Sequence, residues 1–133
     1  MKAWEVLDAA LALMGERERG TSYETADFER NAYGVMAVLL GELDALDCAL
    51  KRIAPDADNR LPPTVASGEE ELMLHPLLCR SVLPYGLASL LLLEEDPSRA
   101  AQFQRRYEEQ KRLLKERFDR PFRHEIRNVY GKL

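Results

Sequence analysis

The chain lacks any long uninterrupted run of apolar residues. Its longest stretch without a charged side chain runs from Ser81 to Leu93 and contains thirteen residues. A helix that crosses a bilayer needs about 20 apolar residues, so we expect no membrane-spanning segment. The stretch is rich in Leu and Ala and poor in β-branched residues, which disfavours a strand and favours a buried helix.

Residues that bind metals or act as nucleophiles are also scarce. The chain has two cysteines, Cys48 and Cys79, and two histidines, His75 and His124. Both cysteines lie among apolar residues, which favours reduced and buried thiols, and a single disulfide also fits this count. His75 and Cys79 are four residues apart, but a zinc site needs three or four protein ligands and no second pair accompanies them. We therefore expect no metal and no cofactor.

The sequence contains no recognisable catalytic or nucleotide-binding motif. The order of its glycines does not match a phosphate-cradling fingerprint. Two acidic clusters, Glu69–Glu71 and Glu94–Asp96, fall at expected helix boundaries, where the first would favour a helix N-terminus electrostatically. We interpret both clusters as solvated surface. We therefore expect no catalytic residue and a protein that is not an enzyme.

The composition and length are typical of a single charged, helix-rich domain. It has 133 residues, of which 46% are hydrophobic and 32% charged, with a net charge of −4. The charge is divided unevenly. From Arg99 onward there are eleven basic and five acidic residues, whereas residues 1–98 hold eight basic and eighteen acidic ones. Either two solvated surfaces differ in charge, or one end of a subunit attracts the opposite end of its neighbour.

Hydrophobic spacing predicts two helices in the first half of the chain. The first carries one apolar stripe and ends near Gly15: Trp4, Leu7, Leu11 and Met14. The second spans about residues 24 to 53, ends before Pro55, and carries a longer seam: Phe28, Ala32, Val35, Leu39, Leu43, Leu46, Leu50 and Ile53. The leucines of this seam are expected to meet the next helix in the central contact of the fold.

A third helix is expected from Pro76 to Glu95. Pro76 suits its first turn, and Pro84 is expected to kink it near residues 80–84. Its core motif consists of Leu83, Pro84, Tyr85, Gly86 and Leu87, and Gly86 would allow another backbone to approach closely. Since this helix is apolar on nearly all sides, we expect it to be surrounded. Leu90→Ala is then expected to cost about 2–5 kcal/mol.

A fourth helix is expected after Asp96, with Asp96 as its N-cap and Pro97 at its first position. We expect it to end at Pro121. Its apolar residues form a narrow stripe between charged ones: Ala100, Phe103, Tyr107, Leu114 and Phe118.

The basic residues of this fourth helix alternate with glutamates. Pairs at i, i+4 such as Arg105–Glu109 and Glu108–Arg112 are typical of intrahelical support. We therefore expect no sequence-specific binding of nucleic acid.

These elements predict an all-α fold, a bundle of about four helices formed by residues 1–119. A long polar loop at residues 54–68, which contains Pro62-Pro63, connects two of the helices. A C-terminal tail, residues 120–133, follows the bundle. Four apolar residues of this tail are the candidate partner-binding residues: Phe122, Ile126, Val129 and Tyr130. The tail either packs against its own bundle or docks onto another chain.

The order of these features resembles the small helical head–tail connector (adaptor) proteins of tailed bacteriophages and prophages. The resemblance spans about residues 23 to 131. It rests on a long helix, a proline-containing loop and a series of short sequences: Val82–Ala88, Glu94–Pro97, Phe103, Arg106–Glu109 and Val129–Gly131.

The resemblance implies a subunit of a ring between portal and tail, through which DNA passes. Its expected partners are copies of itself and the portal or tail-completion proteins. Its expected location is the cytoplasm of a bacterial host, and the virion. The alternative is a helical interaction or regulatory module that dimerises through its long helix.

Overall fold

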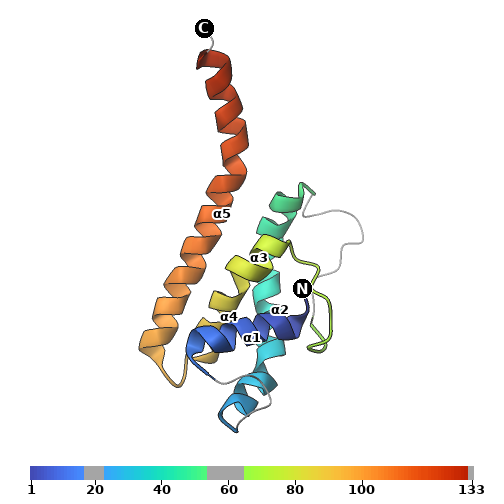
Figure 1. Cartoon of the computed structure of the whole chain (residues 1–133), viewed down its shortest axis with the longest axis vertical. Coiled ribbons are helices and arrows are strands. Elements are labelled where there is room, and N and C mark those ends of the chain that lie inside the picture. The colour runs from blue at the N-terminus through green and yellow to red at the C-terminus, as the bar shows by residue number, and fades with distance from the viewer. Residues whose placement is uncertain (17–22, 54–64, 132–133) are drawn as a thin grey trace.

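The computed structural model describes the backbone of residues 1–16, 23–53 and 65–131, and the side chains of residues 1–16, 25–53 and 65–117. Five helices follow one another along the chain: α1 Ala3–Met14, α2 Tyr23–Lys51, α3 Pro76–Ser81, α4 Leu83–Leu91 and α5 Pro97–Gly131. The described residues contain no strand and a single isolated β-bridge, between Lys2 and Glu71. The predicted all-α class is confirmed (Figure 1). Most of the predicted proline-containing loop, residues 54–64, lies outside the described residues.

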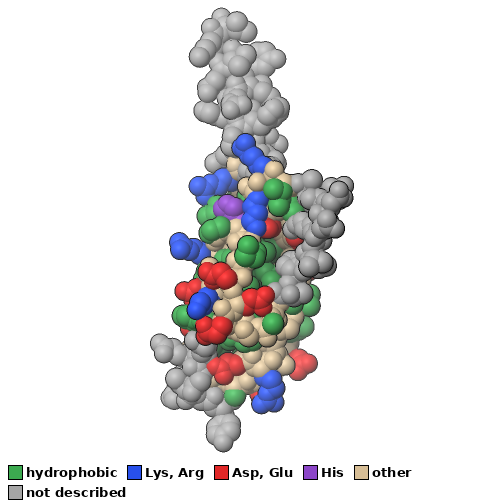
Figure 2. All heavy atoms as spheres, turned by 90° about the vertical axis from the view of Figure 1, so that its right-hand side faces the viewer, with side chains coloured by type: hydrophobic (Ala, Val, Ile, Leu, Met, Phe, Trp, Pro, Cys, Tyr) green, Lys and Arg blue, Asp and Glu red, His purple; other side chains and the backbone are tan. Residues whose placement is uncertain are grey.

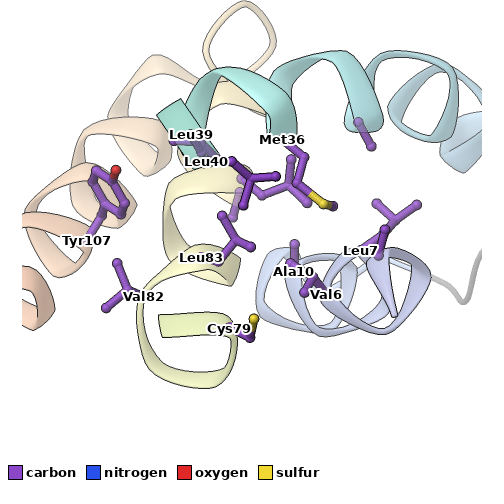
Figure 3. Close-up of a cluster of buried hydrophobic side chains, with 14 of the residues drawn as sticks. Val6, Leu7, Ala10, Met36, Leu39, Leu40, Cys79, Val82, Leu83 and Tyr107 are labelled. Atoms are coloured by element: carbon purple, nitrogen blue, oxygen red, sulfur yellow. The ribbon is translucent and has the colours of Figure 1, made fainter. Parts of the chain in front are cut away.

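Helix α4 occupies the centre of the bundle. It packs most extensively on α5, then on α1 and α2, and also touches α3. Figure 3 shows α4 between α1, α2 and α5, with Leu83 pointing toward Leu40 and Met36 of α2. The prediction of a surrounded helix is therefore confirmed. The contact with α2 is one of four that α4 makes rather than the dominant one.

The predicted third helix is in fact two helices. The break falls at Val82, whose φ and ψ are −116° and −53°, and Pro84 lies in the first turn of α4. A proline there removes no helical hydrogen bond, because the N–H groups of a helix's first turn have no acceptor within the helix. The expected kink near residues 80–84 is thus a full break between α3 and α4. At the start of α3, His75 caps the helix by accepting a hydrogen bond from the Leu77 N–H at 3.1 Å, and Pro76 follows it as expected.

Leu90 does not lie in the core. Its side chain is 36% exposed, whereas Leu87 and Leu83, one and two turns earlier, are fully buried. The expectation that Leu90→Ala empties a buried site is therefore wrong. Ala88, Ser89 and Leu92 around it are buried, so Leu90 lies on the side of this last turn that faces the surface.

The N-terminus of α1 is held by the segment that precedes α3. The N–H groups of Ala3 and Trp4 donate to the carbonyls of Glu70 and Gly68, both at 3.0 Å. Two helix N–H groups that would otherwise have no partner are thereby satisfied. The acidic cluster Glu69–Glu71 thus lies at the N-terminus of α1, not at that of the helix that follows it in sequence.

Helix α2 buries most of its predicted seam. Phe28, Ala32, Leu39 and Leu43 are buried, and Val35, Leu46 and Leu50 are half-buried. Ile53 is exposed, because α2 ends at Lys51 and the chain turns away. Met36 and Leu40, which the seam omitted, are also fully enclosed (Figure 3).

Helix α5 begins as predicted but does not end at Pro121. The Arg99 N–H donates to the Asp96 carboxylate at 3.2 Å, so Asp96 is the N-cap and Pro97 the first residue. The helix continues to Gly131, past the body of the other helices (Figure 1). Pro121 removes one backbone hydrogen bond, which a helix can survive when both flanks remain helical. The residues predicted as a separate tail therefore extend α5, and no change of secondary structure marks the expected boundary at residue 119.

The surface ion pairs of α5 differ from the expected ones. The structure pairs Arg106 with Glu109, Lys111 with Glu108, and Arg112 with Glu116, at 3.9, 3.5 and 2.8 Å. The expected Arg105–Glu109 and Glu108–Arg112 pairs are not formed. Two of the three observed pairs join residues i and i+3, which are neighbours on a helix surface as much as i and i+4.

Candidate interaction surface

A groove of about 620 Å³ lies between the first half of α2 and the end of α4. Helix α2 contributes one wall, from Asp27 to Val38, and the residues from Leu90 to Glu95 contribute the other. This is the end of the molecule where α4 finishes and α5 begins, opposite the end toward which α5 runs (Figure 1).

Apolar side chains line the groove and are accessible to solvent. Val38 is 62% exposed, Leu93 57% and Leu90 36%. Most large apolar side chains of a surface helix face the core, and a single exposed one elsewhere on the surface is common. Here three of them line one concavity, which is the arrangement that favours a partner.

Carboxylates surround this apolar floor. Asp27 lies at the α2 side and pairs with Arg30 at 3.6 Å, while Glu94 and Glu95 lie exposed on the opposite side. Neither Glu94 nor Glu95 has an ion-pair partner among the residues whose side chains are described. The rim therefore attracts cationic groups. The prediction that the cluster Glu94–Asp96 is solvated is confirmed for Glu94 and Glu95.

At Gly34 the α2 wall of the groove has no side chain projecting from the helix backbone. A Cβ atom placed on Gly34 would have no atom within 4 Å. The missing side chain leaves the helix backbone open to close approach from outside, as small residues do at helix–helix contacts. A partner helix can thus reach the apolar floor without displacing a side chain.

The core motif Leu83–Leu87 is not part of this groove. Gly86 faces the ring of Tyr107 on α5: a Cβ atom there would lie 2.8 Å from two ring carbons and 3.1 Å from Leu39. The close approach that we expected at Gly86 therefore exists, but an aromatic ring makes it rather than a backbone. The neighbouring Tyr85 ring lies 5.5 Å from the Arg106 guanidinium. The motif joins α4 to α5 and has a structural role.

Tyr107 is the residue against which this motif packs. Its hydroxyl donates to the Glu42 carboxylate at 3.1 Å, while its ring is almost completely buried. Burial and, second, the charge of Glu42 raise the pKa of Tyr107 above its ordinary value of about 10. The hydroxyl therefore stays protonated and serves as a fixed donor between α5 and α2.

A second polar cluster surrounds Asp47, which is buried. Its carboxylate accepts from the His75 N–H at 2.7 Å and pairs with Lys51 at 2.9 Å. Lys51 also donates to the Met73 carbonyl. These contacts attach the segment before α3 to the end of α2, so we interpret the cluster as a structural clamp.

The cysteines lie near this clamp without forming a reactive centre. Cys48 and Cys79 are both free and buried, and burial raises the pKa of the Cys79 thiol. A raised pKa opposes the thiolate, which is the nucleophile and metal ligand. The Nδ1 atom of His75 is occupied by its helix-cap bond. Among the described residues, no group of three or more His, Cys, Asp or Glu side chains is arranged to hold a metal ion.

The candidate partner-binding residues lie in the second half of α5. Phe122, Ile126, Val129 and Tyr130 fall within the helix, and their side chains lie outside the described residues. Their spacing of i, i+4, i+7 and i+8 is the pattern of one apolar side of a helix. We call these four residues the C-terminal stripe. Leu114 is buried, and beyond it the backbone of α5 runs past the other helices toward the stripe (Figure 1).

Sequence reasoning missed the groove, although its residues carried a signal. Val38 is apolar but lies off the α2 seam, and Leu93 follows the last turn of α4. Apolar residues outside a buried face are candidates for partner contact. Only the folded chain shows that these two come together.

Comparison with known proteins returns no matching family model, no matching curated protein and no matching solved structure. No helix in the part of the chain that the structure describes combines the length and the hydrophobicity that crossing a membrane requires.

Proposed function

We propose that this chain is a structural subunit of the head–tail connector of a tailed phage or prophage, and that it assembles with copies of itself. The observation that carries the proposal is the second half of α5. The backbone of this helix runs past the bundle (Figure 1), and the sequence of that part carries the C-terminal stripe. Apolar side chains favour burial by about 1.5–3 kcal/mol each, and a neighbouring subunit would supply it.

The charge distribution supports end-to-end joining. On the face seen in Figure 2, Asp and Glu side chains gather mostly in the lower half, and Lys and Arg side chains mostly toward the upper half. Contacts between unlike faces generate rings when the rotation closes. Opposite charges at the two ends favour such contacts and disfavour pairing of like faces. An acidic net charge also suits a conduit, since it weakens binding to the DNA that passes through.

A truncation after Asp119 tests this proposal. Because the backbone of α5 runs past the other helices before it reaches the stripe, we expect the melting temperature to change by only a few degrees (Figure 1). Association with itself, and with the portal protein encoded at the same locus, should be lost. Rings in negative-stain images of the full chain, and neighbouring genes for portal, capsid and tail proteins, are further expectations. A large fall in melting temperature with association intact would mean that the end of α5 stabilises its own bundle.

The alternative function is a helical module that dimerises through α2, and one observation favours it. The outward side of α2 carries exposed small or apolar residues at alternating steps of three and four: Asn31, Gly34, Val38, Gly41 and Ala45. This is the spacing of a two-helix seam. Such a dimer would stop at two copies at every concentration, whereas a connector subunit should form larger closed assemblies. Light scattering after size-exclusion chromatography separates the two.

A further inference from the structure

We infer that the groove between α2 and α4 binds the C-terminal stripe of α5 from a second copy of this chain. This inference rests on the proposed self-assembly and names the two surfaces that would meet. One surface is the acid-rimmed groove, with its floor formed by Val38, Leu90 and Leu93. The other is the stripe Phe122, Ile126, Val129 and Tyr130.

Charge complementarity identifies the occupant. The groove presents Asp27, Glu94 and Glu95 around an apolar floor. Residues 112–131 of α5 contain six Lys or Arg and three Asp or Glu, an excess of three positive charges around the stripe. The apolar stripe flanked by cations fits an apolar floor flanked by carboxylates. Pairing of two grooves would instead bring like charges together.

The two surfaces also agree in length. The α2 wall runs from Asp27 to Val38, eleven steps along the helix, or about 16 Å at the helical rise of 1.5 Å per residue. The stripe runs from Phe122 to Tyr130, eight steps along the helix, or about 12 Å. Helix-in-groove contacts use this i, i+4, i+7 pattern of anchors. The stripe is therefore short enough to lie within the groove along its whole length.

The stripe cannot reach the groove of its own chain. Helix α5 begins at Pro97, beside the Glu95 end of the groove, and continues as one helix to Gly131. Phe122 is 25 residues further on, or about 37 Å along the axis. Because the helix holds the stripe away from its own groove, the contact must be made by another copy. The groove lies at one end of the subunit and the stripe at the other, so the contact is head-to-tail.

A complementation experiment with two variants tests the inference. Val38→Arg adds a cation to the groove, and Ile126→Gln/Val129→Gln removes the apolar character of the stripe while keeping a good helix former. Val38 is exposed, so its variant should fold normally, which a helical circular dichroism spectrum and an unchanged melting temperature verify. Leu93→Arg is a second groove variant. The matched controls are Met73→Arg and Leu113→Gln, which change exposed apolar residues outside both surfaces.

Sedimentation equilibrium measures association of each variant alone and of an equimolar mixture. We expect each variant to associate at least tenfold more weakly than the natural chain, and the controls to associate normally. The mixture should recover association, because each partner supplies the surface that the other lacks, and it should stop at one-to-one pairs.

Three other results would overturn the inference, and they differ in what they imply for the proposed function. If the natural chain associates but both variants do so equally well, other surfaces join the copies and the proposed function stands. If Val38→Arg loses association while the stripe variant keeps it, the contact is between like faces, as in the α2 dimer. If the natural chain stays monomeric at every concentration, both the inference and the proposed self-assembly fail.

Discussion

Replacing Gly86 by Ala should destabilise the protein, although the same change elsewhere in its helices should stabilise it. The added Cβ atom would lie 2.8 Å from Cδ2 and Cε2 of Tyr107 and 3.1 Å from Leu39. Carbon atoms are at their best separation at about 3.5–4.0 Å, so the ring contact is too close by about 0.7 Å or more. The ring cannot simply retreat, because the Tyr107 hydroxyl is bonded to Glu42.

The size of the effect follows from two opposing terms. Overpacking a buried contact costs about 1–3 kcal/mol. Ala gains about 0.5–1 kcal/mol over Gly in a helix interior. We therefore expect Gly86→Ala to lower the free energy of unfolding by up to about 2 kcal/mol. Gly41→Ala is the matched control, because its Cβ would meet nothing within 4 Å, and it should raise that free energy by about 0.5–1 kcal/mol.

Urea denaturation followed by circular dichroism at 222 nm measures both variants. Their free energies of unfolding should differ from each other by about 1–3 kcal/mol, with Gly86→Ala below the natural chain and Gly41→Ala above it. In a Tyr107→Leu background the Gly86→Ala cost should shrink, since the clashing ring is gone. Equal stabilisation by both substitutions would refute the close packing of α4 against α5.

Three further predictions follow from the core and its polar contacts. Leu83→Ala should lower the free energy of unfolding by about 2–5 kcal/mol, and Leu90→Ala by less than about 1 kcal/mol, because only Leu83 is fully buried; equal costs in chemical denaturation would contradict the assigned burial. Asp47→Ala should cost about 1.5–3 kcal/mol, since it removes a charged partner of the His75 N–H and of Lys51, whereas Lys51→Met should cost less than about 1 kcal/mol; the reverse order in thermal melting would argue against the clamp. Because the pKa of Tyr107 is raised in the folded state, its contribution to stability should be complete below about pH 10 and decline as the pH rises above that value. The free energy of unfolding, measured between pH 8 and pH 11, should fall more steeply for the natural chain than for Tyr107→Phe, and identical slopes would exclude Tyr107 as the source.

Helical periodicity and caps were readable from the sequence because they depend on neighbours in the chain. Met14 and Gly15 marked the end of α1, and Asp96-Pro97 marked the start of α5. The Leu-rich composition predicted a buried helical segment, although not its division into α3 and α4. In each case the deciding interaction joins residues within about four positions, so the local sequence contains it.

Tertiary contacts decided what the local sequence left open. Leu83 and Leu90 are the same residue type in one helix, yet only Leu83 is fully buried. Glu69–Glu71 precedes α3 in sequence but lies at α1, because the carbonyls of this segment satisfy the N–H groups there. The groove joins residues near position 30 to residues near position 93, a separation that no periodicity reports. Residue type and spacing therefore determined which helices form. The packing of α4 among its neighbours decided which side chains remained at the surface.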